Sequence, residues 1–201
     1  MRVVEEIFYH YHDPKVEGIP WTVGTQLQFN STHLNQFTVF YENWNPTLMI
    51  DNESYSLREG CLKLIDEKIE ALSTKTKDTL LKQFREITES NGVFLLETMY
   101  EEVRQKHFPQ LPSRRNCLWV FKKHSINCWK NIFPNHYLYK LKLTGTVYKT
   151  QGSKFQWEFE PLSNLRQKAM LYWSSPEDQE EQQDDEYLFV GDAVILEITE
   201  N

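Results

Sequence analysis

Apolar and polar residues alternate in two separated parts of the chain. Residues 3–11 are rich in β-branched and aromatic types, which predicts a strand that stops at Asp13-Pro14. Residues 137–148 alternate more regularly and predict a long strand. The next apolar segment, residues 153–160, predicts the hairpin partner of that strand.

Shorter apolar runs predict further strands and one short helix. Residues 118–121 have the length and composition of a buried strand. Ser125 follows as a predicted N-cap of a short helix that carries Trp129 and ends before Pro134. Residues 186–200 predict two closely spaced strands around Gly191-Asp192.

A helical block is predicted at about residues 57–107. Ser56 and Glu59 have the spacing of a capping box at its start. The first apolar stripe recurs every three or four residues, at Leu57, Cys61, Leu64, Ile65, Ile69 and Leu72. A second helix over 80–87 is expected to stop near Gly92, and a third runs over 94–103. Residues 161–173 predict a later helix.

The order of these elements predicts an α+β fold, because strands and helices occur in separate runs rather than as repeating βαβ units. The chain has 201 residues, of which 40% are apolar and 25% charged, which is enough for one domain with a sizeable core. We therefore expect a single domain over residues 1–201.

Composition also argues against several classes of protein. No apolar run approaches the roughly 20 residues that cross a bilayer, and Glu5 and Glu6 interrupt the N-terminal segment, unlike a signal peptide. We expect a cytoplasmic protein with no membrane partner. The 3 cysteines have no CxxC spacing, and the histidines form no HExxH motif, so neither disulfides nor a metal site is predicted.

The net charge of −7 is unevenly distributed. Seven carboxylates fall within residues 177–186, so the remainder of the chain is close to neutral. A basic interval follows the helical block, with Arg114, Arg115, Lys122, Lys123, His124 and Lys130. This interval is compatible with binding phosphates, and equally with an ordinary solvated face, which we favour slightly.

Two residues are candidates for acid, base or ligand chemistry. Glu186 lies where the acidic loop becomes an apolar strand, and catalytic groups are common at such positions. The alternative is that Glu186 is one of several exposed acids. His10 shares a strand face with His12, and a hydrogen-bonded histidine without a catalytic role is the alternative there.

Three separated segments together resemble a known family. They are FYHYHD at the N-terminus, PSRRNCLWVF with the short Trp-bearing helix, and AMLYW with the later EYLFVGDAV. The family is an uncharacterised one of bacteria and phages whose members look like divergent ADP-ribosyltransferases of the diphtheria-toxin type. The resemblance implies a split, mainly antiparallel sheet.

The resemblance also implies a site for NAD as substrate, without a metal. Glu186 would be the catalytic glutamate and His10 the histidine that contacts the adenosine ribose. The remaining implied site residues are Trp119 and Trp129 for stacking nicotinamide, with Ser113 and Arg114 for the pyrophosphate. Tryptophan stands where that superfamily usually has tyrosine, and the rivals for stacking are Tyr137, Tyr139, Tyr172 and Trp173.

These expectations predict an NAD-dependent ADP-ribosyltransferase that modifies an unidentified protein or nucleic-acid acceptor, in a phage or in bacterial defence. A carboxylate beside the ribose would stabilise an oxocarbenium-like state as the nicotinamide bond breaks. The alternative is a non-catalytic phage or bacterial inhibitor or adaptor, which would bind a partner through its acidic loop and aromatic surface.

Overall fold

The computed structural model describes residues 1–13, 21–30, 32, 34–66, 72–155, 160–174 and 180–200. It confirms the α+β class with antiparallel sheets. The chain forms two compact units, one of residues 1–39 and 96–201 and the other of residues 40–95. The expectation of one domain over residues 1–201 stays a prediction.

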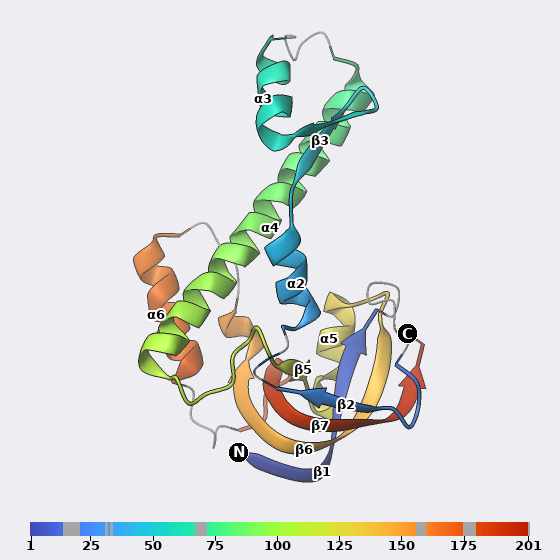
Figure 1. The fold of residues 1–201 in the computed structure, drawn as a ribbon, viewed down its shortest axis with the longest axis vertical. Helices are drawn as coiled ribbons and strands as arrows, with labels where there is room; N and C mark the ends of the chain where they lie inside the picture. Colours follow the sequence, from blue (N-terminus) through green and yellow to red (C-terminus); the bar gives the residue numbers. More distant parts are fainter. Residues whose placement is uncertain are drawn as a thin grey trace. The chain divides into compact units, whose positions relative to one another are not determined.

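The first unit is built on an antiparallel sheet (Figure 1). Its strands are β1 (Arg2–His12), β2 (Gln26–Phe29), β5 (Leu118–Val120), β6 (Tyr137–Gln151) and β7 (Asp185–Thr199). The order is β1-β6-β7-β2, and β5 also pairs with β7. Phe121, just after β5, exchanges two backbone hydrogen bonds with Tyr9 of β1, at 2.8 and 2.9 Å. Strand β5 therefore links β7 back to β1, so that β1, β6, β7 and β5 follow one another in a ring of pairings.

Two predictions about these strands were wrong. The predicted C-terminal pair is a single 15-residue strand, β7, because Gly191 adopts a φ of +145° that keeps the chain in the sheet. The partners of β6 are β1 and β7 rather than a local hairpin. Residues 152–154 form a 3₁₀ turn, and residues 156–159 of the expected hairpin lie outside the described part of the chain.

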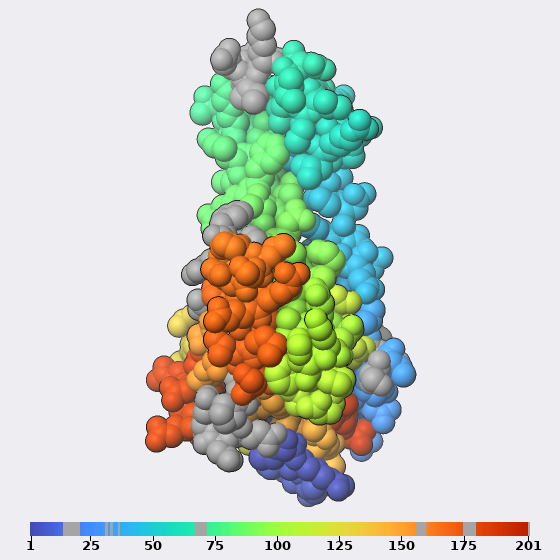
Figure 2. Space-filling model, turned by 90° about the vertical axis from the view of Figure 1, so that its left-hand side faces the viewer, coloured from blue at the N-terminus to red at the C-terminus, as the bar shows by residue number. Residues whose placement is uncertain are grey.

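Helices of the first unit include α5 (Ile126–Ile132), α6 (Leu162–Trp173) and the C-terminal part of α4 (Thr74–His107). Ser125 is the N-cap residue of α5, as predicted, but its side chain makes no capping hydrogen bond. Helix α6 and the C-terminal part of α4 lie side by side on the molecular surface (Figure 2).

Two apolar clusters fill the first unit. One is made mainly of sheet residues, including Phe8, Leu141 and Phe189. The other joins the C-terminal part of α4 to α6 and the sheet, with Tyr100 and Tyr172 fully buried. This second cluster surrounds the candidate site.

The second unit has its own small core. Strands β3 (Thr47–Ile50) and β4 (Glu53–Ser56) form a hairpin that the sequence pattern missed, followed by α3 (Leu57–Asp66). The predicted capping box is confirmed: Ser56 Oγ accepts from the Glu59 N–H at 3.3 Å, and Glu59 Oε2 accepts from the Ser56 N–H at 3.3 Å. The apolar core includes Leu48, Ile50, Leu64 and Leu80.

The helical block is confirmed, with one difference. The predicted second and third helices are the single 34-residue helix α4, which continues through Gly92. One glycine costs a helix only about 1 kcal/mol, so neighbouring residues with good helix propensity override it. Helix α2 (Gln36–Asn43) precedes the block. Ile69 of the predicted first stripe lies outside the described residues.

Candidate functional site

A short turn between α4 and β5 carries Arg114. Asn35 holds this turn, because its Nδ2 donates to the Arg114 carbonyl at 2.5 Å and its backbone N–H donates to the Arg115 carbonyl at 2.7 Å. The side-chain oxygen of Asn35 also accepts from the Thr38 N–H at 2.9 Å, at the start of α2. The turn is therefore fixed from a segment about 80 residues earlier in the chain.

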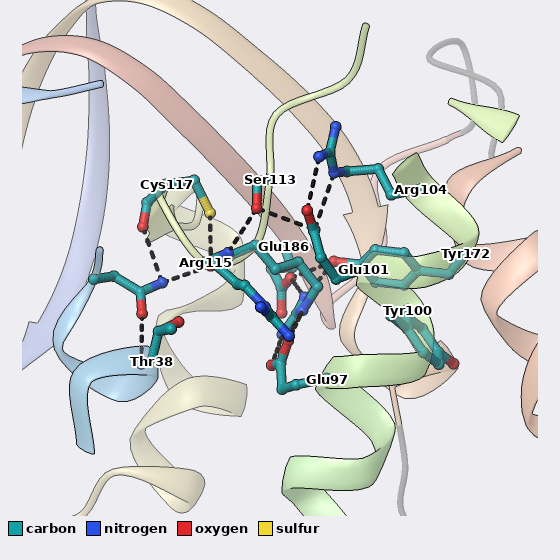
Figure 3. A network of polar contacts seen from close by, with 12 residues as sticks. Thr38, Glu97, Tyr100, Glu101, Arg104, Ser113, Arg115, Cys117, Tyr172 and Glu186 are labelled. Atoms are coloured by element: carbon teal, nitrogen blue, oxygen red, sulfur yellow. Dashed lines mark hydrogen bonds and ion pairs between the residues drawn. The ribbon is translucent and has the colours of Figure 1, made fainter. Parts of the chain in front are cut away.

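The Arg114 guanidinium is the centre of a buried polar cluster. Its partners Glu97, Tyr172 and Glu186 are labelled in Figure 3. Arg114 is 3% exposed. Its Nε donates to Glu97 Oε2 at 3.0 Å and its Nη2 to Glu97 Oε1 at 3.0 Å, which is a side-on, two-pronged contact. Its Nη1 donates to Glu186 Oε1 and to the Tyr172 hydroxyl oxygen. One guanidinium thus faces two carboxylates.

Aromatic rings surround the same guanidinium. Its central carbon lies 3.9 Å from the ring centroid of Phe155, 4.9 Å from that of Trp119 and 5.2 Å from that of Tyr172. Rings in this position attract a cation and exclude water from it. The indole N–H of Trp119 is a buried donor with no hydrogen-bond partner in the described ranges.

Glu186 is the second residue of β7 and is 6% exposed. Its Oε1 accepts from Arg114 Nη1 and from the Tyr172 hydroxyl, the latter at 2.7 Å. Its Oε2 accepts no hydrogen bond from any residue that the structure describes. The two oxygens of this buried carboxylate therefore differ, because Arg114 and Tyr172 both bind Oε1.

Burial and charge set the protonation of this cluster. Burial opposes the charged form of Arg114, but the Glu186 and Glu97 carboxylates outweigh it and hold the pKa of Arg114 well above its usual value. Burial raises the pKa of Glu97, against the effect of Arg114. Burial also raises the pKa of Tyr172, so its phenol stays a neutral donor.

A second buried Arg–Glu pair lies one helical turn along α4. Arg104 Nη2 donates to Glu101 Oε1 at 2.7 Å, and Arg104 Nε donates to Glu101 Oε2 at 3.0 Å. Glu101 Oε2 also accepts from the Ser113 hydroxyl at 3.0 Å. Ser113 Oγ in turn accepts from the Arg115 N–H at 3.1 Å, so this pair supports the turn that carries Arg114.

His10 lies on β1 among other rings. Its Nδ1 is 2.8 Å from the Trp119 carbonyl oxygen. Because a carbonyl only accepts, Nδ1 carries the proton and Nε2 is an acceptor in the neutral ring. Burial and the neighbouring His12 lower the pKa of His10 to about 3, and burial lowers that of His12 to about 4. The rings of His12 and Trp21 stack with centroids 4.2 Å apart.

Trp129 lies in a different environment. Its Nε1 donates to the Asp185 carbonyl at 3.3 Å. Its ring stacks with those of Phe121 and Phe133, at centroid distances of 6.0 and 6.3 Å. None of these residues belongs to the Arg114 cluster, although Asp185 directly precedes Glu186 in β7.

The structure brings some predicted site residues together and leaves others apart. Arg114, Glu186 and Trp119 meet in one cluster, whereas the Ser113 side chain binds Glu101 of the neighbouring Arg104–Glu101 pair. His10 reaches Trp119 through the carbonyl, whereas Trp129 packs elsewhere. The solvated face that we favoured for the basic interval does not hold for Arg114, because the folded chain encloses it between α4, α6 and β7.

Sequence reasoning missed Glu97 and assigned Tyr172 only as a rival for stacking. A signal for Glu97 was present, since Glu97 and Glu101 are four residues apart, beside the apolar positions Leu96 and Tyr100. Two acids next to a buried helical stripe indicate buried basic partners. The identity of those partners depends on tertiary contacts.

Within the described residues, no group of three or more His, Cys, Asp or Glu side chains is arranged to hold a metal ion. No helix in this part of the chain combines the length and the apolar character needed to cross a bilayer. The described cysteines Cys61, Cys117 and Cys128 are free thiols.

This geometry defines the class of the protein: an α+β protein with a buried Arg–Glu cluster between helices α4 and α6 and strand β7 of an antiparallel sheet. Residues 8–201 match the family described as "Protein of unknown function (DUF2441)". The chain therefore belongs to the DUF2441 family. No curated protein matches the sequence.

Proposed function

We propose that this protein is an NAD-dependent ADP-ribosyltransferase that modifies a macromolecular acceptor. The observation that carries the proposal is the carboxylate of Glu186, whose Oε1 is held by Arg114 and Tyr172 while its Oε2 has no partner in the described chain. A fixed carboxylate with one available oxygen suits a group that holds a ribose hydroxyl. Its negative charge would stabilise the oxocarbenium-like state that forms as nicotinamide leaves.

Two further groups support an NAD site near Glu186. The neutral His10 ring offers Nε2 as an acceptor, which suits a contact with a ribose hydroxyl. The buried Trp119 N–H needs an acceptor, and the carboxamide oxygen of nicotinamide is one. Both groups adjoin Trp119, whose ring contacts Arg114.

Arg114 takes a different role from the one that the family resemblance implies. Its N–H groups are engaged by Glu97, Glu186 and Tyr172, so the proposal assigns it to holding Glu186 rather than to the pyrophosphate. Replacing it should then weaken NAD binding indirectly, through the loss of the Glu186 geometry.

The test compares Glu186→Gln with the parent protein. The substitution keeps the shape of the side chain and removes its charge, so NAD should still raise the melting temperature. Turnover of labelled NAD, with a bacterial lysate as the source of acceptor, should fall by roughly 10²–10³-fold, as is typical of losing one electrostatic group.

The matched control is Glu180→Gln, which removes an exposed carboxylate from the acidic loop. Its turnover should stay within a few-fold of the parent; Glu177 lies outside the described residues and is a poorer control. Equal losses in both variants would contradict a catalytic Glu186. Failure of millimolar NAD to raise the melting temperature of the folded parent protein would favour the alternative, a non-catalytic inhibitor or adaptor that binds a partner through its acidic loop.

A further inference from the structure

We propose that Tyr172 is the positioning residue for Glu186, acting through its hydroxyl rather than by stacking on a ligand. The inference rests on the proposed function for its effect on turnover. The hydroxyl accepts from Arg114 Nη1 and donates to Glu186 Oε1 at 2.7 Å. It therefore bridges the cation and the carboxylate that the cation binds.

The position of Tyr172 leaves no ring face for a ligand. Its side chain is 0% exposed and lies on the inner face of α6. Neighbouring rings hold it on several sides, with centroids 5.1 Å away for Tyr100 and 4.8 Å away for Trp173. This packing leaves no room for nicotinamide to stack on the Tyr172 ring. The same packing fixes the direction in which the Tyr172 hydroxyl points.

A phenol is the right chemical group for this bridge. It both donates and accepts, whereas the guanidinium only donates and the carboxylate only accepts. Ionisation would place a third negative charge beside Glu97 and Glu186, and burial works in the same direction, since it raises the pKa of Tyr172. The hydroxyl proton therefore stays available to Glu186 Oε1. The titratable groups that bear on the phenol are Arg114, Glu186 and Cys117.

The structure offers a matched pair of substitutions. Tyr172→Phe removes the bridging hydroxyl and keeps the buried ring. Tyr100→Phe makes the same chemical change in an adjoining ring that is also 0% exposed. The Tyr100 hydroxyl donates to the Lys154 carbonyl instead of the carboxylate cluster. If deleting any buried hydroxyl were enough to reduce turnover, turnover should fall in both variants.

The first measurement is steady-state turnover of NAD. In Tyr172→Phe, kcat should fall by about 10- to 100-fold, the range for removing a group that orients a reacting residue, while KM for NAD changes by less than about threefold. In Tyr100→Phe, both parameters should stay within about threefold of the parent. Equal falls of kcat in the two variants would overturn the inference.

The second measurement does not depend on catalysis. Nitrogen-15 NMR reports rotation of the Arg114 guanidinium, whose signal is assigned by its loss in Arg114→Lys. The rotation should be slow in the parent and in Tyr100→Phe, and faster in Tyr172→Phe. Unchanged slow rotation in Tyr172→Phe overturns the inference even if the parent proves to have no NAD turnover, so the two failures are distinguishable.

Discussion

Two buried Arg–Glu pairs, Arg114–Glu97 and Arg104–Glu101, both take their acid from helix α4 but differ in how their charges balance. The acids are one turn apart on α4, and each binds its arginine through two N–H groups. Arg104 faces one carboxylate and also donates to the Leu111 carbonyl at 2.9 Å. Arg114 faces two carboxylates and a phenol.

The difference separates a structural pair from a candidate site. Around Arg104, one positive and one negative charge cancel, and the remaining bonds tie down backbone carbonyls and Ser113. Around Arg114, a second carboxylate has been buried although stability alone does not require it, because each buried ion costs several kcal/mol in desolvation. An excess of buried carboxylate is typical of functional sites, where charge is arranged for a ligand.

Removing the arginines should give the largest contrast in stability. Arg114→Met leaves two carboxylates buried without a cation, so the free energy of unfolding should fall by about 3–5 kcal/mol. Arg104→Met leaves one carboxylate, in a pair that is less buried, and should cost about 1–3 kcal/mol. Urea denaturation of both variants measures the difference. Equal losses would mean that the second carboxylate adds no energetic cost.

The pH dependence of stability should reveal the buried carboxyl group of Glu97. Burial raises the folded-state pKa of Glu97 above its ordinary value of 4.5, so the folded protein binds the proton more tightly than the unfolded chain does. The stability from this group is full below pH 4.5 and is lost as pH rises through the raised pKa. The slope is at most about 1.4 kcal/mol per pH unit.

The variant Glu97→Gln cannot lose this proton. The free energy of unfolding of this variant, measured by urea denaturation from pH 4.5 upward, should therefore not show the decrease expected from Glu97 in the parent. The difference in free energy of unfolding between the parent and the variant should shrink as pH rises. Glu101→Gln is the control and keeps the decline, because Glu97 is intact. If stability changed with pH in the same way in the parent and in Glu97→Gln, the raised pKa of Glu97 would be contradicted.

The smallest effect is expected from an exposed pair on the same helix. Arg85 Nε lies 2.7 Å from Glu89 Oε1, but the two side chains are 77% and 56% exposed. Water and salt screen such pairs. Arg85→Met should leave the urea midpoint unchanged within experimental error. A clear loss there would show that burial is not what distinguishes the two inner pairs.

Local patterns predicted much of the secondary structure. The capping box at Ser56, a helix over residues 161–173 and a strand over residues 3–11 were all predicted, because their signals lie within a few residues. The structure has them at Ser56, at residues 162–173 and at residues 2–12. The break at Gly92 and the division at Gly191 were wrong. In both places the surrounding helix or sheet tolerates glycine. In β7 a glycine is also required at position 191, because Gly145 approaches closely: a Cβ on Gly191 would lie 2.7 Å from the Gly145 Cα.

The sequence by itself determined the α+β class, most helix positions and the candidates His10, Glu186 and Trp119. Only the tertiary structure decided that Arg114 is buried and which groups it binds. Its partners Glu97, Tyr172 and Glu186 are 17, 58 and 72 residues away along the chain. Periodicity and capping depend on neighbours within a turn or two, whereas ion pairing over such separations depends on how α4, α6 and β7 pack together. That packing converts a residue of the basic interval into the centre of the candidate site.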